Sequence, residues 1–250
     1  MASWATKRRF MYGGGVILVL TLVVGIVFWS IVYSAPTCSD GVRNGEEKGV
    51  DCGGACQRIC TSDALNPIVL WSKVFNISGD VYSLVAYVEN PNINSKNRRA
   101  KYQFQVYDTD NKLITVRDGE TSIPKNRKFA IFETGVILKN SKPKLVNFQF
   151  TAFSPWEKDT QSEPDVSVTY GAISSSTSPS LSGTVTNNSL QDIPQLELTV
   201  FALDSKENVL GASRTFIDNL YKRTSQDFVF TWQKAFEGNI SVINVFYRSP

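Results

Sequence analysis

The chain has 250 residues, 42% of them hydrophobic, with no histidine and a formal net charge of +3. Lys7, Arg8 and Arg9 carry a charge equal to that total, so the rest of the chain is neutral and gives no electrostatic case for nucleic acid. The lack of histidine removes the commonest general base and metal ligand, which argues against hydrolytic or metal-assisted chemistry.

An uncharged stretch after the basic cluster predicts a transmembrane helix over residues 12–34, preceded by a cytoplasmic N-terminus of residues 1–11. Its core, residues 13–32, would be about 30 Å long as a helix, which matches the hydrocarbon layer of a bilayer. The basic cluster predicts that the N-terminus lies inside and the C-terminal domains outside, periplasmic or extracellular. A cleaved signal peptide is the alternative, but its apolar core is normally only about 7–15 residues long. We therefore expect an anchor in the plasma or cytoplasmic membrane.

The four cysteines all lie in one stretch of residues 37–61, as Cys38, Cys52, Cys56 and Cys60. The stretch follows the anchor directly, in the compartment where thiols oxidise, and its even cysteine count predicts a disulfide-rich knob with two bridges. Three pairings are open. Zinc is the alternative, but its ligand pairs usually have close spacing at both ends of the site, which the first cysteine does not provide.

Oxygen-bearing side chains alternate with glycines in this Cys-rich segment: Asp40, Asn44, Glu47 and Asp51. Hard oxygen ligands on a Gly-rich loop suit Ca²⁺, although the spacing is not that of an EF-hand. A solvated acidic turn explains the same residues equally well. If calcium binds, the affinity expected of an extracellular module is a Kd of about 10⁻⁴–10⁻³ M.

The segment reads CSDGVRNGEEKGVDCGGACQRIC, with Asp-Cys-Gly-Gly placed between flanking cysteines. It resembles a short Cys-rich repeat found in secreted and surface proteins, often beside membrane anchors or adhesion modules. The resemblance covers 23 residues and implies an extracytoplasmic structural module rather than a catalytic one.

Beyond this segment the sequence predicts an all-β ectodomain. Short alternating runs rich in Val, Ile, Phe and Tyr are separated by turn residues, and no amphipathic helix is evident. The expected strands are residues 81–88, 100–107, 112–117, 129–133, 145–153, 181–186, 196–203, 209–210, 228–232 and 240–247.

The strand pattern occurs twice. Asn90 matches Asn187, which lies 97 residues later. The further matches are Val106 and Tyr107 with Val200 and Phe201, and Asp108 and Asn111 with Asp204 and Asn208. A period of this length fits two tandem antiparallel β-sandwiches, which we place at residues 65–159 and 164–250.

Both halves resemble the FxLYD and late-embryogenesis-abundant type-2 group of immunoglobulin-like sandwiches. The pattern is a strand ending in Val-x-Asn, a polar loop, an alternating strand, an Asp turn and a resumed apolar strand. The second half carries it as SGTVTNNSLQDIPQLELTVFALDSKENVL and the first as AYVENPNINSKNRRAKYQFQVYDTDNKLI. The resemblance implies an immunoglobulin-like fold and leaves function open.

The two halves differ in charge, and the chain carries basic loops and glycosylation patterns. Residues 62–159 hold 14 basic and 10 acidic residues, and residues 160–250 hold 6 and 9, so basic loops could attract an acidic partner or simply be solvated. The basic loop residues are Lys96, Arg98, Arg99, Lys101, Lys125, Arg127 and Lys128. Asn76, Asn187 and Asn239 each begin a glycosylation acceptor pattern.

The sequence thus predicts a non-enzymatic, single-pass membrane protein that presents sandwich loops and strand edges to protein partners. An accessory subunit of an envelope complex, such as secretion or cell-wall machinery, is the alternative. In that case Gly13, Gly14, Gly15 and Gly25 would let the anchor approach other helices closely. An enzyme using Asp108, Asp110 or Glu120 is disfavoured, because turn chemistry already accounts for such acids.

Overall fold

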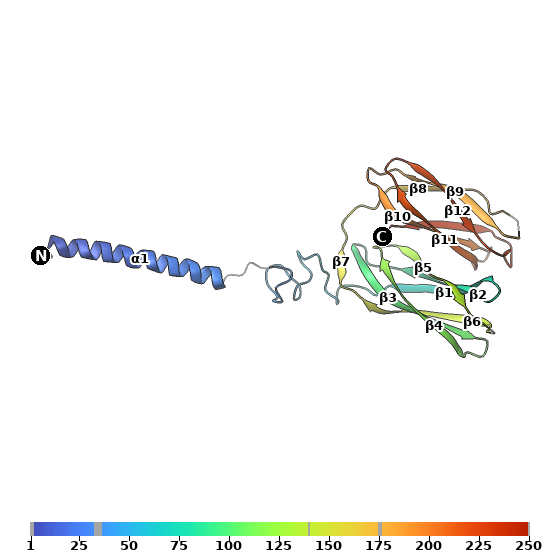
Figure 1. The fold of residues 1–250 in the computed structure, drawn as a ribbon, viewed down its shortest axis with the longest axis horizontal. Helices are drawn as coiled ribbons and strands as arrows, with labels where there is room; N and C mark the ends of the chain where they lie inside the picture. Colours follow the sequence, from blue (N-terminus) through green and yellow to red (C-terminus); the bar gives the residue numbers. More distant parts are fainter. Residues whose placement is uncertain (1–2, 33–36, 140, 175–176, 250) are drawn as a thin grey trace. The chain divides into compact units, whose positions relative to one another are not determined.

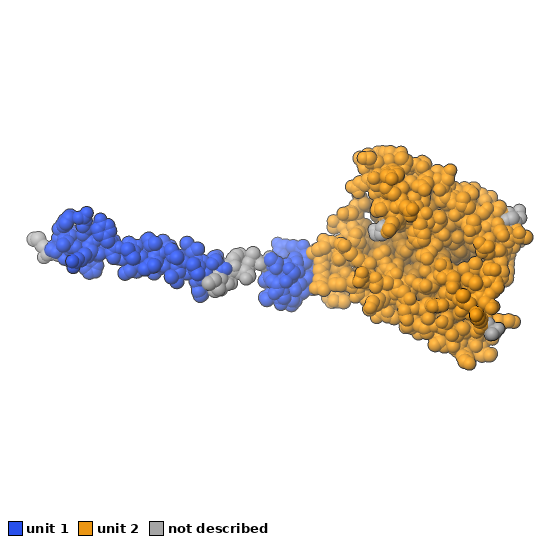
Figure 2. Space-filling view, in the orientation of Figure 1, with its two compact units in different colours: residues 1–56 blue, residues 57–250 orange. Residues whose placement is uncertain are grey.

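The computed structural model describes residues 3–32, 37–139, 141–174 and 177–249. They form one α-helix and 13 β-strands, and the chain divides into two compact units, residues 1–56 and 57–250. Figure 2 colours these units separately. The all-β ectodomain predicted from the sequence is confirmed, as are the N-terminal apolar helix and the two disulfides.

The helix α1 spans Trp4–Val32 and has no buried side chain among its described residues. Its stretch Trp4–Ser30 has a mean hydropathy of 2.4, which makes it long and apolar enough to cross a membrane. If a helix that is apolar on every side packed only one face on a protein core, its other apolar faces would remain in water. This composition therefore supports membrane anchoring. The helix begins eight residues before the expected span and includes the basic cluster; residues 33–34 of that span lie outside the described residues.

The first sandwich of unit 2 consists of two antiparallel sheets (Figure 1). The sheet of order β1-β2-β5 comprises Ile68–Ser78, Val81–Glu89 and Lys128–Ile137. The facing sheet of order β4-β3-β6 comprises Leu113–Ile123, Ser95–Asp108 and Pro143–Phe153, and short β7 (Trp156–Lys158) also pairs with β3. Alternate residues of β2, β3 and β5 point inward and form the core, with Phe104 and Phe129 among its largest members.

The second sandwich repeats this plan. The sheet β8-β9-β12 comprises Val166–Tyr170, Ser180–Asn187 and Ser225–Thr231, and the sheet β11-β10-β13 comprises Val209–Leu220, Ile193–Leu203 and Val242–Arg248. Strand pairings correspond one to one with those of the first sandwich, so β8, β9, β10, β11, β12 and β13 take the places of β1, β2, β3, β4, β5 and β6.

Asn90 and Asn187 hold equivalent places at the end of β2 and β9. Both side chains are buried, and each Nδ2 donates to two backbone carbonyls while each Oδ1 accepts a backbone N–H two residues on. A buried amide must find such partners, so the repeated Val-x-Asn pattern is explained by loop anchoring.

The two Asp turns also repeat, with one correction to the predicted matches. Asp108 accepts from the N–H of Asp110 and Lys112, and Asp204 accepts from those of Lys206 and Asn208. The positive-φ residues are Asn111 and Glu207, at 59° and 63°. Asn111 therefore matches Glu207 and not Asn208, and the strand before it matches two residues further on than expected: Val106 and Tyr107 correspond to Ala202 and Leu203.

The two sandwiches pack face to face, which the sequence analysis did not predict. The outer face of β1-β2-β5 meets the outer face of β11-β10-β13, so four sheets lie in successive layers (Figure 1). The contact is centred on Val85 and Phe132 from the first sandwich and Phe201 from the second, with Trp71 and Tyr87 packed against them. Strands β2 and β10 are therefore buried on both faces, and both sandwiches belong to the one compact unit of residues 57–250.

Candidate functional site

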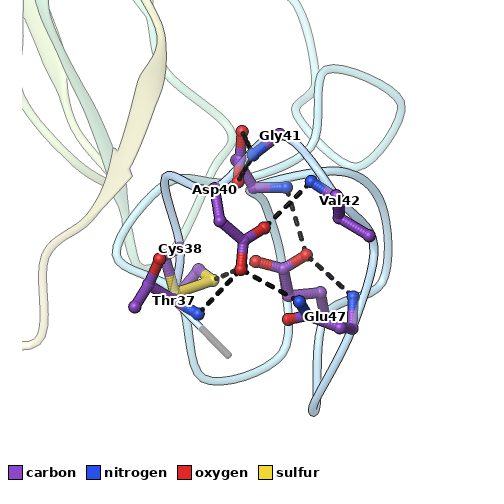
Figure 3. The surroundings of a disulfide bond; sticks show 9 residues. Thr37, Cys38, Asp40, Gly41, Val42 and Glu47 are labelled. Carbon is purple, nitrogen blue, oxygen red and sulfur yellow. Dashed lines mark hydrogen bonds between the residues drawn. A yellow bond between two sulfur atoms is a disulfide. The ribbon is translucent and has the colours of Figure 1, made fainter. Parts of the chain in front are cut away.

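Within the Cys-rich segment, Cys38 and Cys56 form a disulfide with a Cα–Cα distance of 5.6 Å (Figure 3). Cys52 and Cys60 are also disulfide-bonded and no cysteine is free, so the pairing is first with third and second with fourth. The predicted bridges are thereby confirmed and the open choice among three pairings is settled. The zinc alternative is wrong, because all four sulfurs are in disulfides and cannot act as thiolate ligands.

Asp40 organises the start of this segment (Figure 3). Its carboxylate accepts hydrogen bonds from Asn44 Nδ2 at 2.9 Å and from the N–H groups of Thr37 and Val42 at 3.1 and 2.9 Å. These contacts lower the pKa of Asp40, the Asn44 side chain having the largest effect. The carboxylate therefore stays ionised and fixes the turn.

The other two acids also bind backbone N–H groups. Asp51 accepts from Gly41 through both oxygens, at 3.1 and 3.2 Å, and Glu47 Oε2 accepts from Asn44 and Asp51 at 3.4 and 3.2 Å. Glycine is required nearby, since a Cβ on Gly54 would lie 1.6 Å from the carbonyl oxygen of Glu46. These carboxylates take the place of the missing hydrophobic core in holding the loop.

The predicted calcium ligands are not gathered into one acidic cluster. Among the described residues, the three-residue group that could hold a metal ion is Cys38, Glu47 and Cys56, whose ligand atoms lie within 4.8 Å of one another. Its two sulfurs form the disulfide, which leaves one carboxylate. Asp40, Glu47 and Asp51 are instead satisfied by N–H donors, so calcium binding stays a prediction.

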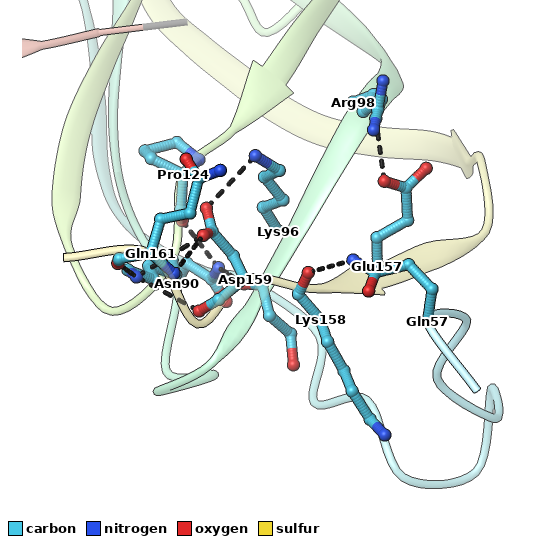
Figure 4. Close-up of polar contacts among 11 residues, drawn as sticks. Gln57, Asn90, Lys96, Arg98, Pro124, Glu157, Lys158, Asp159 and Gln161 are labelled. Carbon is cyan, nitrogen blue, oxygen red and sulfur yellow. Dashed lines mark hydrogen bonds and ion pairs between the residues drawn. The ribbon is translucent and has the colours of Figure 1, made fainter. Parts of the chain in front are cut away.

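The basic loops of the first sandwich are paired with acids distant in the sequence (Figure 4). Lys96 and Lys125 lie 3.2 and 3.5 Å from Asp159. The remaining pairs are Arg98 with Glu157, Arg99 with Glu120, Arg127 with Glu163 and Lys128 with Glu89. Partial burial would raise the pKa of Asp159, but the hydrogen bonds from Lys96 and the N–H of Gln161 and the charges of Lys96 and Lys125 lower it. Except at Lys128, whose carboxylate partner is 3.9 Å away, this arrangement favours a structural role over attraction of an acidic partner.

A cavity of about 430 Å³ lies among these paired side chains, between the 122–127 loop and residues 159–164. Nearby, residues 57–59 run antiparallel to β7: the N–H of Lys158 donates to the Gln57 carbonyl at 2.8 Å, and that of Ile59 to the Trp156 carbonyl at 2.8 Å (Figure 4). The chain is thus fastened to the first sandwich immediately after Cys56.

The glycosylation patterns have unequal access. Asn187 is fully buried and its Nδ2 donates to two carbonyls, so it is not an acceptor in the folded chain. Asn76 donates to the Gly79 carbonyl at 2.7 Å and accepts from Lys234, whereas Asn239 is exposed. Of the acids weighed as catalytic, Asp108 and Asp110 lie in the turn described above and Glu120 pairs with Arg99 at 2.9 Å.

Two polar bridges between the sandwiches had no signal in the sequence. Arg248 Nη2 lies 2.5 Å from the buried carboxylate of Glu197, and its Nη1 donates to Thr121 Oγ1 at 3.1 Å. Arg127 donates to the Tyr247 carbonyl at 2.9 Å and lies over the Tyr247 ring at 4.9 Å. Together with the aromatic contact, they fix the two sandwiches relative to each other.

No protein-family model and no curated protein matches the chain. Among solved structures, red sea bream transglutaminase is 10% identical, with 73% of this chain and 29% of that chain covered and a TM-score of 0.25. A glycoside hydrolase family 2 β-glucuronidase is 8% identical, with 82% and 26% covered and a TM-score of 0.20. The chain spans less than a third of either protein, and likenesses this low carry no argument about function.

Proposed function

We propose that the protein is a membrane-tethered, non-enzymatic module that presents its double sandwich to protein partners outside the cytoplasm. The observation that carries the proposal is the order of parts along the chain: an exposed apolar helix, then two disulfides, then a compact β unit. Disulfides persist outside the reducing cytoplasm, so the second part implies the side on which the third part lies. The basic cluster before the helix favours the same orientation.

The packing of the two sandwiches against each other supports a presenting role. Association costs conformational freedom at the interface, and a body whose two sandwiches are already fixed loses little on binding. Phe201 lies 2% exposed between the sandwiches, and Arg248 of the second sandwich donates to Thr121 of the first. The exposed loops and strand edges are therefore held in constant relative positions.

A topology experiment tests the proposal. Alkaline phosphatase, which folds only outside the cytoplasm, is fused after residue 250 in a bacterial host, with green fluorescent protein in the matched fusion. We expect phosphatase activity and no fluorescence. Replacing Lys7, Arg8 and Arg9 by Asn should reduce the phosphatase signal, because the orienting charge is lost. A fluorescent fusion without phosphatase activity would contradict the proposed localisation.

A second candidate is an accessory subunit whose helix assembles with other membrane helices. Gly13, Gly14, Gly15 and Gly25 favour it, since a Cβ at any of them would meet nothing within 4 Å in this chain. Their surface is therefore open to a neighbouring helix. Exchange of the anchor for an unrelated apolar helix discriminates the two: full function in the exchanged chain contradicts the accessory role, and its loss contradicts simple tethering.

A further inference from the structure

A groove of about 490 Å³ runs along one side of the second sandwich, between β8 and β13. Val166, Val168 and Tyr170 line it from β8, and Val245 and Tyr247 line it from β13. The side chains of Val166, Val168, Val245 and Tyr247 pack against the second core and are only partly buried, whereas Tyr170 is exposed. We call this groove the seam. Along it, residues of the second core are accessible between the edges of the two sheets.

The first sandwich shows what a closed seam looks like. There the Ser72 hydroxyl of β1 donates to the Val146 carbonyl of β6 at 2.7 Å. At the equivalent place in the second sandwich, the Tyr170 hydroxyl donates to the Ile243 carbonyl at 3.1 Å. A serine hydroxyl is attached to Cβ, whereas a tyrosine hydroxyl lies beyond a whole ring, so Tyr170 makes the same bridge across a wider gap. Tyr170 therefore holds the seam open.

The outer edge of β8 carries free backbone groups, whereas on β13 the carbonyls of Ile243 and Tyr247 already accept hydrogen bonds from Tyr170 and Arg127. On β8, the Asp165 carbonyl and the Gly171 N–H bond to the β9 side, at 2.8 and 3.1 Å. Because successive residues of a strand point opposite ways, the N–H and C=O groups of Val166, Val168 and Tyr170 face the seam. Such an edge over an apolar floor is what an added strand recognises.

The end of the seam near the first sandwich is basic. Arg127 and Lys128 line it, and Arg127 already holds a carboxylate, that of Glu163. Lys128 is half exposed, with its partner Glu89 3.9 Å away. An exposed pair at this distance is weak, so Lys128 is available to a second carboxylate.

We propose that the seam accepts an extended strand of a partner protein, apolar at alternate positions and with an acidic residue beside Lys128. The strand adds to the free edge of β8, converting β12-β9-β8 into a four-stranded sheet, and its apolar side chains cover Val168 and Val245. This inference rests on the proposed function and specifies the kind of protein that the double sandwich binds.

The probe is the peptide Ac-Glu-Thr-Val-Thr-Val-Thr-Val-NH₂, added to the purified full chain in detergent micelles. The matched probe has proline in place of the second and third threonines, which removes N–H donors needed for strand pairing. Hydrogen exchange is followed by mass spectrometry. With the first peptide at ten times its Kd, exchange in residues 164–171 should slow about tenfold, because a bound edge opens only when the peptide leaves. Exchange in residues 225–231 should not change.

Variants place the site. Val168→Asp should abolish protection, whereas Val229→Asp, on an exposed residue of the same sheet, should leave it intact. If Val168→Asp unfolds the chain, the comparison of the two peptides on the wild-type chain still shows whether an extended strand binds at the seam. Equal exchange with and without peptide, or equal protection by the proline probe, overturns the proposal. Protection of the same residues that rises with protein concentration alone assigns the seam to a second copy and also overturns it. None of these outcomes alters the topology result, so failure here is distinct from failure of the tether.

Discussion

Replacing Phe201 by alanine tests whether the two sandwiches form one cooperative body. The ring lies 4.9 Å from that of Trp71 and 5.0 Å from those of Tyr87 and Phe246, and the residue is 2% exposed. Buried Phe-to-Ala changes cost about 3–5 kcal/mol. In a body of this size each kcal/mol lowers the Tm by about 2–4 °C, so we expect a decrease of roughly 6–20 °C.

The assay is urea and thermal unfolding of the full chain in detergent, followed by far-ultraviolet circular dichroism. Phe216→Ala is the matched control, because Phe216 is 54% exposed and its truncation should cost less than about 1 kcal/mol. The wild type should unfold in one β-sheet transition, and Phe201→Ala should unfold earlier or in two steps. Two wild-type transitions, or equal effects of both variants, would refute the idea that the interface couples the sandwiches.

Three further predictions concern charge and calcium. Arg248→Ala should lower the free energy of unfolding in urea by about 3–5 kcal/mol, because Glu197 is left buried without its partner. Arg99→Ala, at an exposed pair, should lower it by only about 0–1 kcal/mol. Equal effects of the two variants would contradict this. The pKa of Asp159 is held below its usual 3.8, so the stability that its carboxylate contributes is present above pH 3.8 and is lost as the pH falls through the lower folded pKa. Asp159→Asn should therefore reduce the fall of the urea midpoint between pH 5 and 2.5. An unchanged slope of the midpoint against pH would argue against this. If the Cys-rich segment binds calcium with a Kd of about 1 mM, 10 mM calcium should stabilise the chain by about 1.4 kcal/mol, and superimposable thermal melts in calcium and in chelator would remove the hypothesis.

Local patterns were sufficient to predict the elements and their class. Each of the ten expected strands overlaps an observed one, although residues 112, 232 and 240–241 lie outside, because alternating apolar residues and Asp or Asn turns are properties of short stretches. Strands β1, β7 and β8 were missed. β8 is only five residues long and β7 three, so neither gives a usable period.

Features that depend on distant partners were not readable from the chain. Asp159 lies 63 residues from Lys96, and nothing local indicates that they pair. The four oxygen-bearing residues of the Cys-rich segment have a composition suited to calcium, but the composition does not tell that backbone N–H groups bind the three carboxylates. Nor does it tell that the side-chain oxygen of Asn44 is buried without a hydrogen-bond partner among the described residues. One signal was available: β10 ends in the uninterrupted apolar run of residues 200–203, as expected where a strand is covered on both faces, and that run indicated a second packing surface.

The interlaced disulfides give the tether a mechanical property. A pull on the anchor reaches Cys38 and crosses its bond directly to Cys56, so the 18 residue steps between them carry no load. Extended, those steps would reach about 60 Å, whereas the bridged Cα atoms are 5.6 Å apart. While this bond is oxidised, tension at Cys38 is therefore passed through Cys56 to Gln57, whose carbonyl accepts the N–H of Lys158 in β7. Reduction of the Cys38–Cys56 bond would let the 18 residue steps between these cysteines extend under load.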